Sequence, residues 1–348
     1  MTTNKLKEKI FIISILLISV LYSAANKQES HRKGPYNRLV IANAMVIPGH
    51  GGPAYGPADI IIENDRIVQI ISYNGFTGRS NKDEIPKGDR IIDATGMYVM
   101  PGLIDLHTHI LPTIDDGPVD WDESLALAES LVRAGVRAVA ATSHIKPPIW
   151  PNERKALAAL RAELQTKLAA QGLDLEIHPG AEHWWCGAVL DDLEAGRGQP
   201  YGTGRAFLVE IRPPDDPPLF EERLYRLQRA GFKPVLAHVE RYRIFDGAKG
   251  RKRLRRLVDR GVTAQINLGT LARGFGWARG GNAKKFLMDG LVGLVCGDCH
   301  RAEDVEPAYQ RGLKVLRQLG GDGAVDRLLV RNPQSLLEGR EVDPWVPN

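Results

Sequence analysis

The sequence predicts an α/β fold in which a parallel sheet closes into a barrel, preceded by a small all-β unit. Three observations support this prediction. Residues 36–103 contain short Val- and Ile-rich runs without helical periodicity. From residue 104, strand-like apolar runs alternate with amphipathic segments, and each of these segments ends at a glycine. The chain has 348 residues, of which 43% are hydrophobic and 25% charged, enough for one barrel and a small appendage.

The first 25 residues form a separate segment. Lys5, Lys7 and Lys9 precede the apolar run IFIISILLISVLYSAA, which is short for a bilayer span and ends in small residues. We interpret residues 1–25 as a secretory signal peptide or, if uncleaved, a membrane anchor, and residues 26–35 as a polar stalk. The protein is then expected to be exported or membrane-anchored, and cytoplasmic if this segment is not functional. We expect no other membrane contact.

Residues 36–103 are predicted to form a small β unit. Its strand-like runs are separated by Gly, Pro and Asn-Asp turn signals, and they read RLVIANAMVIPG, ADIIIENDRIVQII and RIIDATGMYVMPG. The segment 104–340 is predicted to form the barrel. Its helical runs are SLALAESLVRAG, ERKALAALRAELQTKLAAQG, FEERLYRLQRAG, KRLRRLVDRG and AKKFLMDG. Each leads into a strand-like run, and these are VRAVAATSH, LEIHPGAE, KPVLAHVE, VTAQINLG and VGLVCGDCH. Such alternation indicates parallel strands joined by crossover helices, with the active site where the strands end.

Metal-ligand side chains follow these strand ends. The candidates are His107, His109, Asp115, Asp116, His144, Glu182, Glu210, His238, Asp298 and His300. A single histidine closing a strand is more often a hydrogen-bonded core residue. Ten ionisable groups at one rim, however, would cost several kcal/mol each without an ion to pair with. Imidazoles and carboxylates without thiolates suit Mn²⁺, Fe²⁺ or Zn²⁺.

Composition and motifs exclude several other classes. The net charge of +4 and pI near 8.9 are only mildly basic, and the basic run at residues 250–261 has helical spacing. That spacing favours a solvated helix face, so no nucleic-acid partner is expected. The three cysteines, Cys186, Cys296 and Cys299, cannot all pair, and the one C-x-x-C has no second pair to complete a zinc site. None has Arg six residues on, which excludes a Cys-x5-Arg phosphatase, and no Walker loop is present.

Residues 104–340 resemble the PHP-type bacterial protein-tyrosine phosphatases that accompany capsule and exopolysaccharide synthesis. The shared segments, in order, are HTHILPTIDDGPVDWDESLALAESLVRAGVRAVAATSH, PGAE, FLVEI, VLAHVERYR, CGDCHR and RNPQSLLEG. The resemblance implies a distorted (β/α)7 TIM-like barrel of PHP type, with residues 341–348 as a tail. It also implies a protein-tyrosine phosphatase acting through a metal-bridged hydroxide. The substrate would be a phosphotyrosine protein, such as a tyrosine kinase of polysaccharide export.

The same resemblance implies two or three divalent ions, Mn²⁺ foremost. One ion would be held by His107, His109, Glu182 and Asp298. Glu182 would bridge to a second ion held by Glu210 and His238. The third would be held by Asp116 or Asp115 together with His144 and His300. Catalysis would depend on His238, Asp298 and Arg241, the last as the phosphate-binding cation.

A second resemblance leaves an alternative open. Residues 36–110, through DATGMYVMPGLIDLHTH, resemble the amidohydrolase superfamily, whose members begin with half of a β-sandwich. This chain shows no strands after the barrel to complete that sandwich. An amidohydrolase would open a cyclic amide or related C–N bond, with Asp298 as the base. Binuclear members commonly use a bridging lysine, and Lys155, Lys167 and Lys233 are not placed for that role; Glu182 could substitute. A non-catalytic binding module is disfavoured because every ligand position is filled.

Overall fold

The computed structural model describes residues 36–48, 52–64, 66–73, 84–273 and 278–347. The segment interpreted as a signal peptide or anchor and the stalk, residues 1–35, lie outside the described residues. Within the described part of the chain, no helix is both long enough and apolar enough to cross a membrane. The chain divides into two compact units. The smaller lies within Met1–Ala44 and Gly56–Gly96, and the larger comprises Met45–Tyr55 and Met97–Asn348.

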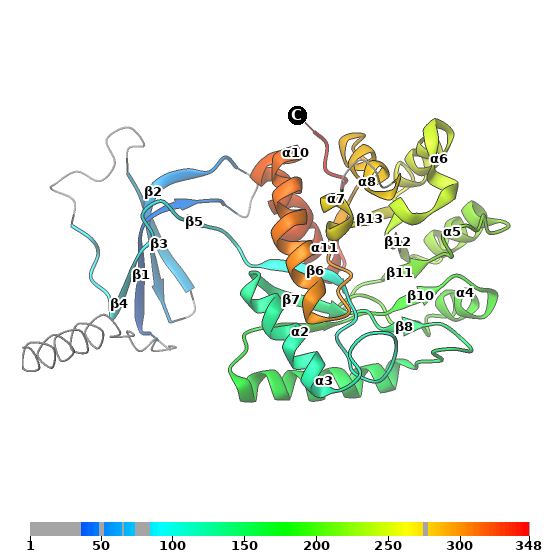
Figure 1. Ribbon diagram of the computed structural model, residues 1–348, viewed down its shortest axis with the longest axis horizontal. Helices are drawn as coiled ribbons and strands as arrows, with labels where there is room; N and C mark the ends of the chain where they lie inside the picture. Colours follow the sequence, from blue (N-terminus) through cyan, green and yellow to red (C-terminus); the bar gives the residue numbers. More distant parts are fainter. Residues whose placement is uncertain (1–35, 49–51, 65, 74–83, 274–277, 348) are drawn as a thin grey trace, which may run out of the picture. The chain divides into compact units, whose positions relative to one another are not determined.

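The smaller unit is built on a β-sheet, as the Val- and Ile-rich runs predict (Figure 1). Its strands are β1 (Arg38–Val46), β2 (Tyr55–Glu63), β3 (Arg66–Ser72) and β4 (Arg90–Asp93), in the order β3-β2-β1-β4. β2 and β3 are antiparallel, whereas β1 and β4 are parallel. Alternate residues of β1 are buried, so one face of this strand packs on a small core of Val40, Ala42 and Ile61. The two-residue β5 (Tyr98–Val99) pairs with the end of β1.

The larger unit is a mixed α/β fold with parallel sheets, which confirms the predicted class (Figure 1). One sheet has the order β14-β13-β12-β11-β10-β8 and the other β6-β7-β9. The strands are β6 (Leu103–Thr108), β7 (Val136–Ala141), β8 (His144–Ile145), β9 (Glu176–Pro179), β10 (Glu182–Trp184), β11 (Ala206–Glu210), β12 (Lys233–Leu236), β13 (Thr263–Asn267) and β14 (Leu294–Cys296).

Helices follow or separate these strands. They are α2 (Trp121–Arg133), α3 (Arg154–Gln171), α4 (Gly187–Glu194), α5 (Phe220–Arg229), α6 (Gly247–Val258), α7 (Leu268–Ala272), α8 (Ala278–Met288), α9 (Ala302–Val305), α10 (Leu313–Asp326) and α11 (Asn332–Leu337). Short turns of 3₁₀ or π type are η1 (Val239–Arg241), η2 (Arg243–Phe245), η3 (Glu306–Gly312) and η4 (Arg327–Arg331). The glycines that end the predicted helical runs lie at helix C-termini in the structure. Gly172 closes α3 with φ 65°, a conformation that L side chains disfavour.

The structure confirms the interpretation of the basic run at residues 250–261 as a solvated helix face. In α6, Leu254 and Leu257 are buried, whereas Lys252, Arg255 and Arg256 point to solvent.

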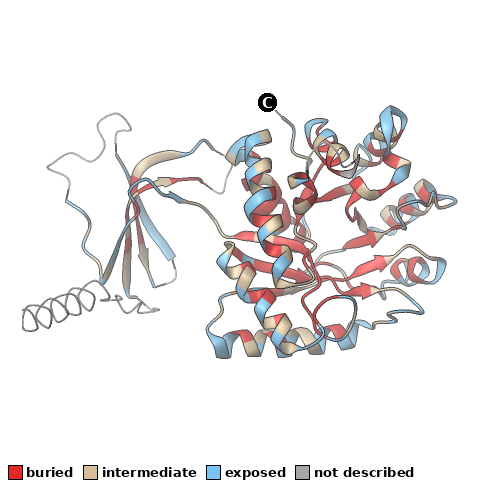
Figure 2. Ribbon diagram, in the orientation of Figure 1, coloured by how far each residue is buried: buried red, intermediate tan, exposed pale blue. Residues whose placement is uncertain are grey.

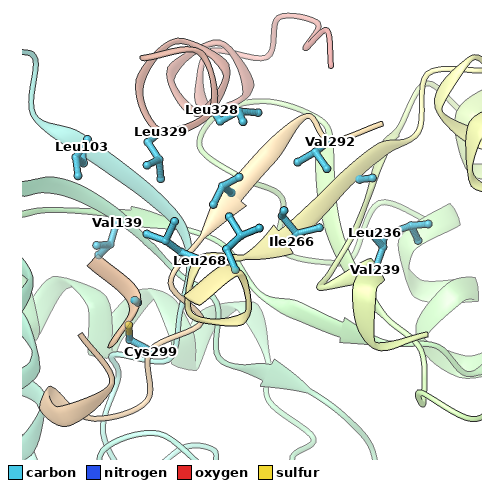
Figure 3. Close-up of a cluster of buried hydrophobic side chains, with 14 of the residues drawn as sticks. Leu103, Val139, Leu236, Val239, Ile266, Leu268, Val292, Cys299, Leu328 and Leu329 are labelled. Atoms are coloured by element: carbon cyan, nitrogen blue, oxygen red, sulfur yellow. The ribbon is translucent and has the colours of Figure 1, made fainter. Parts of the chain in front are cut away.

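Buried residues follow the parallel strands and the inner faces of the helices (Figure 2). The core includes Leu103, Val139, Leu236, Ile266, Leu268, Val292, Leu328 and Leu329 (Figure 3). Each such side chain contributes about 1.5–3 kcal/mol through burial. This packing fixes the strands, and with them the loops at their carboxyl ends.

Candidate metal centre

The strands and the loops after them bring the predicted ligands into one cluster. His107 is in β6 and His109 follows it, while Asp115 and Asp116 lie in the loop before α2. His144 and Glu182 begin the short strands β8 and β10, and Glu210 ends β11. His238 lies just after β12, and Asp298 and His300 lie just after β14. Four groups of these side chains have ligand atoms within 4.8 Å of one another. Asp115 is the one predicted residue that belongs to none of the four groups.

Glu182 occupies the middle of the cluster and is buried. Its Oε2 lies 3.3 Å from Nε2 of His107, 3.3 Å from Nε2 of His109 and 3.3 Å from Nδ1 of His144. Its Oε1 lies 3.2 Å from Nε2 of His238. Two ligand atoms each about 2.1 Å from one ion are separated by roughly 3.0–3.4 Å, so these spacings fit shared coordination. Asp298 completes the inner side of the cluster, with Oδ1 3.3 Å from Nε2 of His107.

Glu210 and His238 lie on the far side of Glu182. Nε2 of His238 is 3.7 Å from Oε1 of Glu210, and Nδ1 of His144 is 3.8 Å from Oε2 of the same carboxyl. Burial, together with the charge of Glu182, raises the pKa of Glu210 to about 8. Among the described residues, Oε1 of Glu182 and Oε2 of Glu210 are buried without a hydrogen-bond partner. Two adjacent carboxylates with orphaned oxygens are costly alone and are satisfied by a divalent cation, so the residues fit such ions.

Asp116 lies at the outer edge of the cluster, with 45% of its side chain exposed. Its Oδ1 is 3.4 Å from Nε2 of His300 and 3.6 Å from Nε2 of His144. The ring of His300 stacks on that of His109, with centroids 4.1 Å apart. A carboxylate oxygen facing two imidazoles therefore provides a third potential ion position.

Asp115 differs from its neighbour because its oxygens are already used. Nδ1 of His109 donates to it at 2.9 Å, and the backbone N–H groups of His144 and Gly117 donate at 2.9 and 3.0 Å. Burial opposes ionisation, but the charge and hydrogen bond of His109 outweigh it and hold the pKa of Asp115 well below its ordinary value. The geometry thus separates the two aspartates: Asp116 faces His144 and His300, whereas Asp115 fixes the ring of His109 with Nε2 toward Glu182.

Asp115→Asn and Asp116→Asn are expected to differ in kind. Asp115→Asn should weaken divalent-ion affinity by about 10- to 100-fold while leaving the number of bound ions at saturation unchanged, because it disturbs the orientation and basicity of His109. Asp116→Asn should lower the saturated stoichiometry by one. Metal titration followed by elemental analysis distinguishes the two. An Asp115→Asn protein that lacks one ion even at saturation would make Asp115 a ligand.

The sequence analysis did not identify two amides on β13 that contact the cluster. Oε1 of Gln265 lies 3.2 Å from Nδ1 of His107 and accepts from the His238 backbone N–H at 2.7 Å. Asn267 accepts from Gln265 at 2.8 Å and donates to Oδ2 of Asp298 at 2.5 Å. Both residues alternate with apolar neighbours in the run AQIN, which places them on one face of the strand. That alternation is the available signal in the sequence, but neither amide carries a charge that marks it as a metal ligand.

Two further side chains near His144, Trp150 and Lys146, were not predicted from the sequence. The indole of Trp150 stacks on the imidazole of His144, with ring centroids 5.0 Å apart and planes 7° from parallel. Nζ of Lys146 lies 3.7 Å from the centroid of Trp184. Backbone strain also occurs at the cluster, because His238 and Asp298 have φ values of 29° and 53°. Such strain is characteristic of functional sites.

Arg241 is attached to the cluster by an ion pair. Its guanidinium lies 3.0 Å from Oδ2 of Asp298, and 35% of the side chain is exposed. Neighbouring Glu240 is buried and accepts from the Asn267 backbone N–H at 3.1 Å, and burial raises its pKa to about 7.

The thiols of Cys296 and Cys299 are free and buried, and burial raises the pKa of each. Neither is therefore an activated nucleophile.

Comparison with known proteins is consistent with this geometry. A family model described as "Capsular polysaccharide synthesis, CpsB/CapC" matches residues 103–338. The tyrosine-protein phosphatase YwqE of Bacillus subtilis is 31% identical over 241 residues, which are 69% of this chain and 93% of that protein. The crystal structures of YwqE from Bacillus subtilis and CpsB from Streptococcus pneumoniae are described as unique metal-dependent tyrosine phosphatases. A chain from these crystal structures matches this protein with a TM-score of 0.63 at 30% identity. The match covers 71% of this chain and 99% of the matched chain.

A parallel α/β fold with His, Asp and Glu side chains gathered at its strand ends is the architecture of a metal-dependent hydrolase. Within that class, the chain belongs to the CpsB/CapC family. The β-aspartyl dipeptidase of Fervidobacterium islandicum AW-1 matches 89% of this chain and 90% of its own, with a TM-score of 0.53 and 14% identity. That match shows a likeness of fold alone. It extends beyond residues 103–338 and so includes part of the preceding β unit.

Proposed function

We propose that this chain is a metal-dependent phosphomonoesterase that removes phosphate from tyrosine in protein substrates. The observation that carries the proposal is the arrangement of Arg241 on Asp298, beside a cluster of buried imidazoles and carboxylates. The cluster suits divalent cations, and Arg241 adds a permanent planar cation that cannot itself be a metal ligand. This combination matches a phosphate monoester dianion, which needs several positive charges around its non-bridging oxygens.

We also propose that the larger unit is a distorted (β/α)7 barrel. Taking β8 as the continuation of β7, and β10 as that of β9, turns the nine strands into seven positions. Backbone hydrogen bonds support closure between the first and last positions. The His109 N–H donates to the Cys299 carbonyl at 3.0 Å, and the Asp298 N–H donates to the His107 carbonyl at 2.8 Å. Closure would gather all ligand-bearing strand ends around one opening.

The proposed ion positions divide the side chains of the four groups into three sets. His107, His109, Glu182 and Asp298 would hold one ion, Glu182, Glu210 and His238 a second, and Asp116, His144 and His300 a third. We propose Mn²⁺ because imidazole and carboxylate ligands without thiolate suit it, with Fe²⁺ and Zn²⁺ as alternatives. When bound, such ions supply positive charge to phosphoryl oxygens and generate a nucleophile from water at neutral pH.

The side chains of this chain would position the substrate. Arg241 is partly exposed, so its free N–H groups can donate to two phosphoryl oxygens while Asp298 holds the guanidinium in place. The Asn267 amide donates to the same Oδ2 of Asp298 that pairs with Arg241, which limits movement of the pair. A cavity of about 540 Å³ lined by Arg241, Asp298 and His300 gives access to this position. The chain therefore contributes both a preorganised phosphate contact and an entrance.

Arg241→Ala is expected to slow aryl phosphate hydrolysis by on the order of 10²-fold, the usual effect of losing one charged transition-state contact. Arg241→Lys should recover only part of the rate, because a single ammonium cannot reproduce the planar fork. Steady-state kinetics on metal-loaded protein, with elemental analysis of both variants, makes the test. Unchanged kcat/KM in Arg241→Ala would remove the phosphate-binding role and with it the observation that carries the proposal.

The family description suggests the biological setting. Because the matching family is described by capsular polysaccharide synthesis, we propose a phosphotyrosine protein of that process as the substrate. A tyrosine kinase of polysaccharide export would be such a protein. We further propose that residues 1–25 direct export or membrane anchoring, as their sequence pattern predicts.

Amide hydrolysis is the second candidate function. It is supported by the resemblance of residues 36–110 to the amidohydrolase superfamily.

A further inference from the structure

The entrance to the candidate metal centre is rich in arginine. Four guanidinium side chains line the cavity of about 540 Å³, and we call it the arginine pocket after them: Arg241, Arg273, Arg301 and Arg311. Asp298 and His300 line the same cavity, so the pocket is continuous with the proposed ion positions. Only Arg241 has a role in the chemistry proposed above. The other arginines therefore need a different explanation.

The acidic groups that line the arginine pocket are already engaged. Asp298 pairs with Arg241, and one oxygen of Asp304 accepts from the backbone N–H groups of His300 and Arg301, each at 2.9 Å. Arg311 pairs with Glu306 at 3.2 Å, but both side chains are largely exposed, which makes the pair weak. Within the described residues, no carboxylate lies within ion-pair distance of the Arg301 guanidinium. The pocket thus presents positive charge that its own carboxylates do not neutralise.

A second cavity, of about 590 Å³, provides a contrast. Trp184, Trp185 and several prolines line it, together with Arg212 and Arg223. Here each arginine has a carboxylate partner, because Arg212 pairs with Asp215 at 2.7 Å and Arg223 with Asp191 at 3.2 Å. Arg301 of the arginine pocket differs from both of these arginines, because no carboxylate of the described residues pairs with it.

We propose that the arginine pocket binds an acidic side chain of the substrate polypeptide close to the phosphotyrosine, with Arg301 as the main contact. The proposal rests on the proposed phosphatase function and adds the class of peptide that is preferred. Arg241, the proposed phosphate contact, lines the same pocket as Arg301. Neighbouring residues of an extended peptide are about 3.4–3.8 Å apart, so a Glu or Asp one to three positions away can reach the pocket. Guanidinium groups suit carboxylates because both can form two parallel hydrogen bonds.

The test uses two phosphotyrosine peptides that differ only in having Glu or Gln on both sides of the modified residue. The metal-loaded full chain is expected to turn over the Glu peptide with a kcat/KM about 5- to 10-fold higher than the Gln peptide at physiological ionic strength. Arg301→Gln should bring this ratio close to one, and Arg301→Lys should restore part of it. Arg133→Gln is the matched control. Arg133 ends α2, just before β7 begins, so it lies at the opposite end of the strands from the pocket.

Binding provides a readout that does not depend on turnover. Both peptides are also prepared with a non-hydrolysable phosphonate in place of the phosphate, and their affinities are measured by fluorescence anisotropy. A preference for Glu that is present in the wild-type and Arg133→Gln proteins and lost in Arg301→Gln supports the proposal. Equal affinity for both peptides, or a preference that survives in Arg301→Gln, overturns it. If neither phosphopeptide is hydrolysed, the phosphatase function fails while the anisotropy still decides whether the pocket selects acidic peptides.

Discussion

Replacing Glu182 with Gln is expected to lower aryl phosphate hydrolysis by at least about 10³-fold and to reduce the number of divalent ions bound. Glu182 approaches the rings of His107, His109, His144 and His238 within 3.2–3.3 Å, so two proposed ion positions share its carboxylate. A neutral amide removes the charge and one of the two oxygen ligands. Metal content should therefore fall further in Glu182→Gln than in His144→Ala, which affects the third position.

Glu240→Gln is the matched control for that measurement. Glu240 is also buried and lies beside the cluster, but it belongs to none of the ligand groups and accepts from a backbone N–H, which a Gln oxygen can also do. Its metal content should equal that of the wild type. A Glu182→Gln protein that keeps a full complement of ions would show that Glu182 does not bridge two positions.

Removal of the ions is the second change with a large expected effect. Dialysis against a chelator should abolish phosphatase activity, and adding Mn²⁺ should restore it. The metal-free cluster combines the unpartnered oxygens of Glu182 and Glu210 with several imidazoles, so ions that bind only the folded state should also raise the melting temperature. Calorimetry with and without Mn²⁺ measures this effect separately from catalysis. Full activity in metal-free protein would refute the whole set of proposed ligands.

Much of the fold could be predicted because its signals are local. Helical runs that end at a glycine and lead into Val- and Ile-rich strands specify parallel strands with crossovers, and α2, α3, α5, α6 and α8 occur where these runs predict helices. The cluster followed from the same rule, since the strands of a parallel sheet end at one edge. The helices α7, α9, α10 and α11 lie outside the predicted runs, and so does α4. Its run GAVLDDLE has only eight residues, too few for a clear helical period.

What the sequence could not give are contacts between distant segments. Asp115 and Asp116 are adjacent, and only the fold turns one toward His109 and leaves the other facing His144 and His300. The pairing of Arg241 with Asp298, rather than with neighbouring Glu240, depends on where the loops after β12 and β14 meet. Gln265 and Asn267 carry no charge, so nothing in the sequence marks them as part of a metal site. Their role becomes visible through their hydrogen bonds to His107 and Asp298.

The most direct test of the central claim is a substrate comparison on one preparation of the full chain. Metal-free protein is reconstituted with Mn²⁺ and then assayed with an aryl phosphate and with a cyclic amide such as dihydroorotate. We predict turnover of the aryl phosphate, dependent on Arg241 and on the added ion, and no turnover of the amide. Hydrolysis of the cyclic amide without phosphatase activity would contradict the account and assign the site to amide chemistry.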